Sequence, residues 1–525
     1  MLTHRLSNCR CIKHEKTAEV IKEVDILADN LKGEILGARD EITITGTAYY
    51  VSESGDDNND GLSPKAPVRT IDKVNTLDLR SGDGVFFKRG DLFRGSVHSK
   101  PGVTYAAYGA GEKPRLYGSP EDGADAGKWT LAEGTSNIWK YHRRLVDIGV
   151  VVFNHGEKNS IKKMPSYVDG KWVLKSDRTT PFEVAKHMKQ DLSHFSACEL
   201  PLHDANPVPN VRYSGCVGDL YLRCDNGNPG EIFDSIEFVP LGAVIRIGTS
   251  SNVTIDNLCL KYSNFGVSGG TQKNLRITNC EIGWIGGCIQ GYSTSTETMG
   301  NPWRFGNGIE IYGGCDSFVV HHNYVYQCYD AGVTHQLSAG GTGDCKQKNV
   351  EYTDNLIEYC IYNYEYFLGK PDAVESVRFQ QNILVRGNIM RYAGFGFGEQ
   401  RPEPDTYFPA AHIKGWDHDN YLDENYVIEN NIFDRSRNMV FHCVAVKKQY
   451  LPLSRNNIII QYDDTPPAYF GRWGVKGETV DTPFDENVKT FISEAVGDTT
   501  SGVYYAERDW LFDLPDYLPK KDRNC

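Results

Sequence analysis

Short runs of alternating apolar and polar residues recur between residues 241 and 463, separated by turns rich in Asn and Gly. Segments such as NVTID, NLRIT and NVEYT place an apolar side chain at every second position. This period of two is typical of β-strands with one buried face, because successive side chains of a strand point to opposite sides. The pattern therefore predicts many short strands. Thr17–Leu31, whose apolar positions have helical spacing, is instead expected to form a short helix.

The same region contains an internal repeat, an Asn followed by an apolar triplet. Its Asn residues are Asn257, Asn279, Asn323, Asn355, Asn388, Asn431 and Asn457, with successive intervals of 22, 44, 32, 33, 43 and 26. One coil of three short strands needs about 20–30 residues, so most intervals hold a coil and a loop. We expect a stack of coils in which buried Asn side chains bind turn backbone groups and stack on one another.

Two sets of motifs resemble known proteins. TAYYVS, SGDDNNDGLSP and GVFFKRG resemble the N-terminal entry of right-handed parallel β-helix proteins. GNGIEIYG, YDAGVTHQ, IYNYEYF and AAHIKGW are similar to motifs of carbohydrate-active β-helix enzymes in the pectate-lyase-like superfamily, above all its glycoside hydrolases. The resemblance implies an all-β fold, a right-handed parallel β-helix with an inserted, mostly-β, sandwich-like module.

The loss and return of the repeat predict five segments. They are an N-terminal extension (1–45), a cap with the first coils (46–121), the inserted β module (122–240), the main β-helix (241–463) and a C-terminal tail that packs on the solenoid (464–525).

Composition narrows the partners and the compartment. The net charge is 56 − 69 = −13, which argues against nucleic acid because phosphate binding requires clustered Lys and Arg. No stretch approaches the roughly 18 apolar residues of a membrane span, and no signal peptide is visible at the N-terminus. The 14 cysteines lack the regular spacing of a disulfide framework and are expected to be buried thiols. We expect a cytoplasmic protein, or a secreted one if the native N-terminus has been replaced.

Strand parity selects the candidate catalytic carboxylates. If Ile309, Val333 and Tyr364 point inward, Glu310 and Glu365 point outward, two coils apart, with Thr334 between them. The family resemblance implies Asp330 and Glu365 as the catalytic pair, with Glu310 as a third candidate. Strand spacing allows both the close carboxyl pair of retaining glycosidases and the wider pair of inverting ones, so the stereochemistry stays open.

Polar and aromatic residues around these carboxylates are candidates for substrate binding. Charged or amide groups can hydrogen-bond sugar hydroxyls, and aromatic rings can stack on sugar faces. The candidates are His335, Gln336, Glu399, Arg401, His412, Lys414, Trp284, Trp303, Tyr366 and Trp416.

The sequence favours a glycoside hydrolase that cleaves plant- or host-derived oligosaccharides or polysaccharides with two carboxylates, without a metal or other cofactor. One alternative is a polysaccharide lyase or uronate epimerase, with Lys414, Arg401, His412 or His335 as the base and Ca²⁺ to neutralise the uronate. Another is a non-catalytic, glycan-binding solenoid. The oligomeric state is not predicted.

Overall fold

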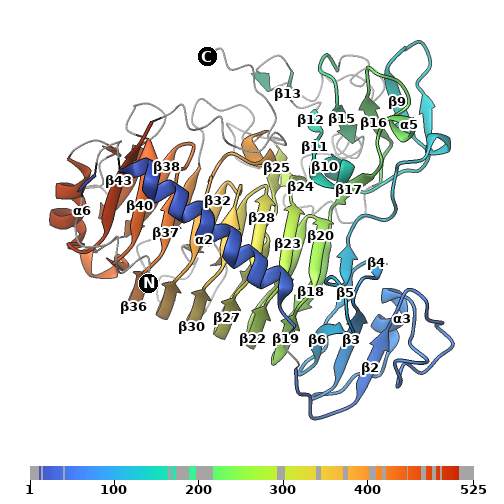
Figure 1. The fold of residues 1–525 in the computed structure, drawn as a ribbon, viewed down its shortest axis with the longest axis horizontal. Coiled ribbons are helices and arrows are strands. Elements are labelled where there is room, and N and C mark those ends of the chain that lie inside the picture. The colour runs from blue at the N-terminus through green and yellow to red at the C-terminus, as the bar shows by residue number, and fades with distance from the viewer. Residues whose placement is uncertain are drawn as a thin grey trace.

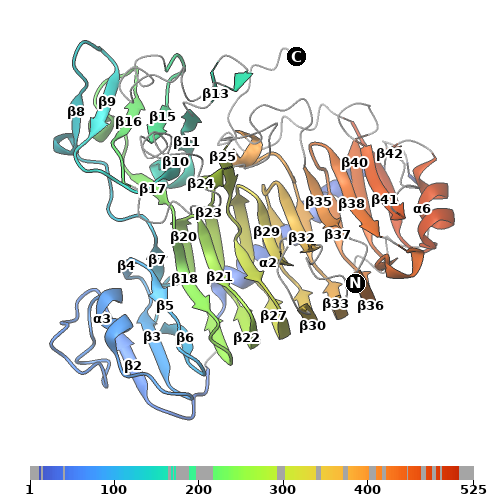
Figure 2. The same ribbon diagram turned by 180° about the vertical axis from the view of Figure 1, so that it is seen from behind.

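The chain forms a parallel β-helix, in which three long sheets run along one axis (Figures 1 and 2). This confirms the all-β solenoid expected from the sequence. The structure is a computed structural model that describes residues 11–12, 16–39, 42–163, 167–168, 171–172, 188–196, 217–292, 302–337, 345–369, 377–400, 410–416, 421–445, 447–462, 469–475, 481–484 and 487–507.

Sheet I has eleven parallel strands. In spatial order they are β4 (Leu92–Arg94), β7 (Arg115–Tyr117), β20 (Cys259–Ser263), β23 (Glu281–Ile285), β28 (Tyr324–Cys328), β31 (Leu356–Glu358), β34 (Ile389–Arg391), β37 (Ile432–Asp434), β40 (Ile458–Tyr462), β43 (Gly502–Ala506) and β1 (Cys11–Ile12).

Sheet II has ten strands, of which only the pair at one end is antiparallel. They are β5 (Val97–His98), β18 (Ala243–Gly248), β21 (Phe265–Gly269), β26 (Ile309–Tyr312), β29 (Ala331–Leu337), β32 (Tyr362–Leu368), β35 (Ala411–Trp416), β38 (Met439–Ala445), β41 (Tyr469–Val475) and β42 (Asp481–Pro483).

Sheet III has ten parallel strands and closes each coil. They are β2 (Ala48–Val51), β3 (Gly84–Lys88), β6 (Thr104–Tyr108), β19 (Val253–Asp256), β22 (Gln272–Thr278), β27 (Cys315–His321), β30 (Cys345–Thr353), β33 (Arg378–Arg386), β36 (Tyr421–Glu429) and β39 (Leu453–Arg455).

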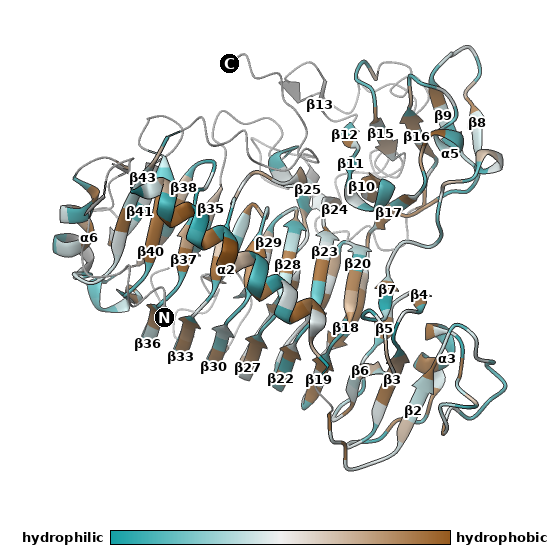
Figure 3. Ribbon diagram, viewed as in Figure 1, coloured by the Kyte–Doolittle hydropathy of each residue, from teal (hydrophilic) through white to brown (hydrophobic). Residues whose placement is uncertain are grey.

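The interior is one continuous apolar core along the solenoid axis. Alternate residues of every coil fill it, as Phe318 and Val320 do in β27 and Ile383 and Val385 in β33. The strands accordingly alternate along their length between apolar and polar positions (Figure 3). The nine described cysteines that the structure classifies are all buried free thiols, so the expected interior thiols are found there.

A buried asparagine ladder lies at the corner between sheets III and I. Asn355, Asn388 and Asn431 each accept a hydrogen bond at Oδ1 from the backbone N–H and the side-chain amide of the preceding Asn, at 2.9–3.1 Å. Each also donates from Nδ2 to a backbone carbonyl of the coil before it. The ladder therefore binds corner backbone groups that water cannot reach.

Asn257 and Asn279 are not part of this ladder, contrary to the sequence alignment. Both lie at the corner position one residue before the ladder position. Their φ angles of 58° and 53° are left-handed, a conformation that Asn tolerates better than most residues. In the next coils His322, at φ 56°, precedes Asn323 in the same way. The ladder position after Asn279 is Cys280, whose backbone N–H donates to Asn323 Oδ1 at 2.9 Å.

Short helices close the two ends of the apolar core. Ile71 and Val74 of α3 (Ile71–Thr76) cover the first coils, and Thr70 caps this helix by accepting from the backbone N–H of Lys73 at 3.1 Å. At the other end, Val488 and Ile492 of α6 (Val488–Val496) join the same core. The sequence repeat fades at residue 463, but the coils continue beyond it. Strand β41 extends sheet II there, and β43 extends sheet I.

Helix α2 (Thr17–Gly37) runs diagonally over the outer face of sheet I (Figure 1). It is longer than the segment Thr17–Leu31 expected from the sequence. Its residues Val20, Val24 and Ala28 are buried against the apolar outer residues of the sheet, which include Tyr324, Leu356, Ile389, Ile432 and Ile458. Among the described residues, no helix has the length and apolar character that crossing a bilayer requires.

Two sheets project from the solenoid between β7 and β18. One is β11 (Lys158–Asn159), β10 (Ile148–Phe153) and β17 (Ile236–Pro240); the other is β12 (Ile161–Lys163), β15 (Ser193–Ser196), β16 (Leu220–Arg223), β9 (Ile138–Tyr141) and β8 (Trp129–Leu131). The described part of this region is thus mostly β, as expected. Its Lys162 forms a fully buried ion pair of 2.6 Å with Asp147, whose other carboxylate oxygen accepts from the backbone of Ile289.

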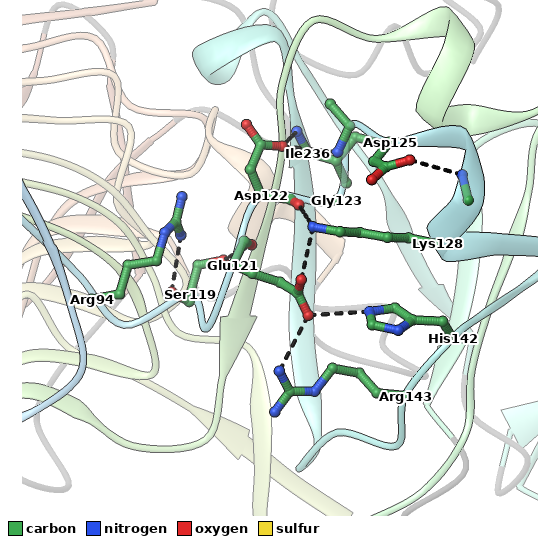
Figure 4. Close-up of polar contacts among 12 residues, drawn as sticks. Arg94, Ser119, Glu121, Asp122, Gly123, Asp125, Lys128, His142, Arg143 and Ile236 are labelled. Carbon is green, nitrogen blue, oxygen red and sulfur yellow. Dashed lines mark hydrogen bonds and ion pairs between the residues drawn. The ribbon is translucent and has the colours of Figure 1, made fainter.

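An ion cluster lies where the chain leaves the first coils for this module (Figure 4). Glu121 Oε2 lies 2.7 Å from Lys128 Nζ, and Oε1 lies 3.2 Å from both His142 Nε2 and Arg143 Nη1. Partial burial opposes the charge of Glu121, but these three hydrogen bonds outweigh it and lower its pKa to about 2. The cluster therefore connects Glu121, at the start of the module, to residues next to β8 and β9.

Candidate active site

One row of residues follows the outer face of sheet II at constant register. Strand pairing aligns, from one end to the other, His98, Arg246, Ser268, Glu310, Thr334, Glu365, Lys414, His442 and Arg472. The residues just before them, including Ile309, Val333 and Tyr364, belong to the interior core. This polar row confirms the strand parity inferred from the sequence, and it contains two of the three predicted catalytic carboxylates.

Glu310 is a buried carboxyl group in the middle of the polar row. It is 7 % exposed, and its Oε2 accepts a 2.5 Å hydrogen bond from Asn307 Nδ2. Ser268 lies in the adjacent coil, with its hydroxyl 3.4 Å from Glu310 Oε1. Burial above all, together with the negative charges of Asp330 and Glu365, raises the pKa of Glu310 to about 7 against the opposing effect of the hydrogen bonds from Asn307 and Ser268. Near neutral pH this side chain can therefore be an acid, whereas an ordinary Glu is ionised.

Asp330 comes directly before β29, between the coil of Glu310 and that of Glu365. Its backbone N–H donates to the carbonyl of Gly306, and its carbonyl accepts from the backbone of Tyr362, both at 3.1 Å. The side chain is buried, and its charge acts on Glu310 more strongly than that of Glu365 does. The charges of two predicted catalytic carboxylates, Asp330 and Glu365, therefore both act on the third, Glu310.

Glu365 and Lys414 form an ion pair across adjacent strands of the polar row. Lys414 Nζ lies 2.5 Å from Glu365 Oε1, and the carboxylate is 5 % exposed. The ammonium group also lies 4.4 Å from the centre of the Tyr362 ring. A short charge-assisted hydrogen bond of this kind favours the ionised carboxylate. Lys414, predicted as a substrate-binding residue, thus has a direct contact with a predicted catalytic one.

Three predicted substrate-binding residues lie inside the solenoid instead. His335 is fully buried and hydrogen-bonds Tyr352 and Gln380, because it follows the outward Thr334 and so points inward. Tyr366 is interior for the same reason, one position after Glu365, and its ring fills the space beside Gly415.

His412 is also enclosed, 3.0 Å from Asn363 and beside the Phe433 ring. Burial lowers the pKa of His335 to about 4 and that of His412 to about 3. Both imidazoles are therefore neutral structural groups. Their burial does not support the role of catalytic base that the lyase alternative gives to His335 or His412.

The tryptophans differ in position. Trp284 is 3 % exposed and stacks on Phe397 beneath the inserted module, so it is a packing residue rather than a sugar-stacking one. Trp303 lies in the hairpin of β24 (Cys288–Tyr292) and β25 (Pro302–Phe305) and is 40 % exposed. Trp416 ends β35, but its side chain lies outside the described residues.

The remaining predicted contacts differ in their positions. Gln336, on the same strand face as Thr334, is partly exposed between Tyr312 and Phe367 of the neighbouring strands. Glu399, in η6 (Phe397–Gln400), forms a 2.5 Å ion pair with Arg437. Arg401 lies outside the described residues. No group of three or more His, Cys, Asp or Glu side chains in the described part of the chain is arranged to hold a metal ion.

Asn307 is a site residue that the sequence reasoning missed. Its Nδ2 donates to Glu310, while its Oδ1 accepts a 2.8 Å hydrogen bond from the backbone N–H of Ala331, next to Asp330. The side-chain amide is thereby oriented so that only its NH₂ faces the carboxyl group of Glu310. The motif GNGIE, with Asn three residues before the Glu, was the available signal.

Comparison with known proteins gives a limited result. No family model matches the chain. A lacto-N-biosidase of Bifidobacterium longum subsp. longum is 34% identical over 130 residues, which cover 23% of this chain and 7% of that protein. The chain thus matches only a small part of its curated relative.

Solved structures also align with the chain. XylC in complex with xylose gives a TM-score of 0.40 at 11% identity, covering 80% of this chain and 77% of that one. A GH136 lacto-N-biosidase from Eubacterium ramulus gives 0.36 at 14% identity, covering 88% and 67%. At these scores the likeness carries no argument about the site, which rests on the geometry above.

Proposed function

We propose that the chain is a glycoside hydrolase whose catalytic groups are the carboxyl groups of the polar row. The observation that carries this proposal is the contrast between Glu310 and Glu365. Glu310 is buried with its pKa raised to about 7, whereas Glu365 is ion-paired with Lys414. Glycosidic bond cleavage requires one protonated and one ionised carboxyl group at neutral pH, and opposite environments of this kind provide them.

In the proposed mechanism Glu310 is the general acid and protonates the departing glycosidic oxygen. Glu365 is the base that activates a water molecule, and Lys414 keeps it ionised. Asp330 helps to keep the proton on Glu310 through its negative charge. Glu310 and Glu365 are separated by the strand of Thr334, so their backbones lie about 10 Å apart. This separation leaves room for a water molecule and supports an inverting reaction.

The proposed substrate is a plant- or host-derived oligosaccharide that lies against the outer face of sheet II. Trp303 and Gln336 are predicted sugar contacts that remain accessible, and Lys414 and Glu399 are also partly exposed. The identity with part of a lacto-N-biosidase makes 4-nitrophenyl lacto-N-bioside the first substrate to test.

The test compares Glu365→Gln with the matched control Glu351→Gln, an exposed carboxylate on the outer face of sheet III. On a panel of aryl glycosides and oligosaccharides, we expect Glu365→Gln to lower kcat by roughly 10²–10⁴-fold while the control retains wild-type turnover. NMR of the first product anomer should show inversion. Equal turnover by both variants would refute the assignment of Glu365.

Asp330→Asn separates the two possible roles of Asp330. If Asp330 acts only on the pKa of Glu310, this variant stays active and the alkaline limb of its pH profile moves to lower pH. If Asp330 is itself the ionised partner, the variant loses activity as Glu365→Gln does. Glycan binding without turnover on every substrate, or release of unsaturated uronides, would favour the solenoid or lyase alternatives instead.

A further inference from the structure

Two buried cations converge on one amide oxygen far from the polar row. Arg89 Nη2 and Lys113 Nζ donate to Asn257 Oδ1, at 3.1 and 2.8 Å. Arg89 and Lys113 are 6 % and 4 % exposed. Arg89 also donates to the carbonyl of Ala38, after α2, so this cation pair joins the N-terminal extension, the first coils and the main solenoid.

The positive charge of this cluster exceeds its negative charge. Among the described residues, the negative charge of Asp256 acts on both cations, and Asp256 accepts a 2.8 Å hydrogen bond from the Asn257 side chain that both cations contact. Its other oxygen accepts from Thr278 and Asn279. Arg89 Nη1 is buried and has no hydrogen-bond partner among the described residues. Buried charges are normally paired, so within the described part of the chain two cations beside one carboxylate leave one positive charge without a counter-charge.

The ionisation of Lys113 is consistent with this imbalance. Burial lowers its pKa to about 8, and the charge of Arg89 acts in the same direction. Most lysine side chains titrate more than two pH units higher. A bound anion would offset the repulsion from Arg89 and favour the ammonium form of Lys113.

A pocket of about 370 Å³ lies beside the cluster, on sheet III and its corner with sheet I. It shares Asp256, Thr278 and Asn279 with the cluster and adds the exposed Arg276 and the pair His321 and His322. His322 Nδ1 lies 2.7 Å from Asn279 Oδ1. Arg276 is thus the cation that lines the pocket, and Arg89 and Lys113 lie behind it, connected to Asp256 of its lining through Asn257.

We propose that this pocket binds an oxyanion group, such as a phosphate or a sugar carboxylate, which contacts Arg276 and is attracted by the buried charges of Arg89 and Lys113 behind it. The bound group would lie beside Arg89, which contacts both Ala38 of the extension and Asn257 of the main solenoid. The site lies on a different sheet from the polar row, so the proposal does not depend on the proposed hydrolase activity.

The test is thermal unfolding of the full chain at pH 7 with rising sodium phosphate, against sodium chloride of equal ionic strength. We expect the Tm of the wild type to rise saturably with phosphate alone. Lys113→Met and the surface variant Arg276→Met should each weaken phosphate binding at least tenfold by calorimetry. Arg80→Met, which removes an exposed cation, should bind phosphate as the wild type does. Without phosphate, Lys113→Met should be as stable as the wild type or more so.

Parallel titrations identify the source of the oxyanion. A stronger response to glucuronate than to phosphate would assign the site to a sugar acid, and the reverse to phosphate; both support the proposal. Identical Tm curves in phosphate, glucuronate and chloride would overturn it, as would an equal response to neutral glucose.

Discussion

At the residue scale, the proposed chemistry depends on how one carboxyl group is enclosed. Glu310 is buried between Asn307 and Ser268, and two further carboxylates raise its pKa. The sequence predicted its direction, because alternation fixes which strand residues point outward. It did not predict Asn307, whose role depends on a contact with the next coil. His335 and Tyr366 were selected by residue type, and strand parity would have excluded both.

Glu310 should also destabilise the fold at neutral and alkaline pH. Its pKa is about 7 in the folded chain and about 4.5 when exposed, so the folded state binds more protons between these values and stability falls as pH rises through them. At pH 8 the Glu310→Gln variant should therefore be more stable than the wild type by about 2–3 kcal/mol, and near pH 4 the two should be equal. Urea unfolding at both pH values measures this. If the stability difference between Glu310→Gln and the wild type were the same at both pH values, burial would not destabilise the ionised carboxyl group.

At the element scale, the coil corners explain both the success and the error of the sequence repeat. The motif correctly predicted an interior ladder from Asn323 to Asn457, because the backbone groups at a buried corner require a side-chain partner. The motif also assigned Asn257 and Asn279 to the ladder position, but each of them lies one residue before it. That preceding position is left-handed, and Asn is favoured there as well. Asn alone therefore does not distinguish the two positions.

The ladder predicts a large difference between two asparagines of one coil. Asn388→Ala removes the partner of the Asn355 backbone and side chain and should lower the free energy of unfolding by about 2–4 kcal/mol. Asn382→Gly, in an exposed Asn column at φ 56°, keeps the backbone conformation and should cost less than about 1 kcal/mol. Denaturant midpoints of the two variants provide the comparison. Similar losses would contradict the structural role of burial in the ladder.

At the scale of the whole molecule, α2 covers an apolar surface that the solenoid would otherwise expose. The residue after each ladder Asn is apolar and points outward on sheet I: Tyr324, Leu356, Ile389, Ile432 and Ile458. This column was a sequence signal for a covering element, because exposed apolar stripes of that length are rare in soluble domains. The sequence predicted a helix but not its partner, since packing between residues so far apart in the chain leaves no local pattern.

Two substitutions in α2 test this docking. Val24 is fully buried against sheet I, so Val24→Asp should lower the free energy of unfolding by about 3 kcal/mol or more. Ile26, two residues later, is 52 % exposed. Ile26→Asp should therefore change the free energy of unfolding by less than about 0.5 kcal/mol. Hydrogen exchange should show faster exchange in sheet I strands only for the first variant. Equal exchange in both would mean that α2 does not stabilise the sheet.

The central claim is that Glu310 donates a proton to the leaving group, and leaving-group dependence tests it most directly. A 2,4-dinitrophenolate departs without protonation, whereas the alcohol of a natural glycosidic bond requires it. Glu310→Gln should slow hydrolysis of an oligosaccharide by roughly 10²–10⁴-fold and of the matching dinitrophenyl glycoside by less than about tenfold. Equal losses on both substrates, or no loss on either, would contradict the assignment of Glu310 as the general acid.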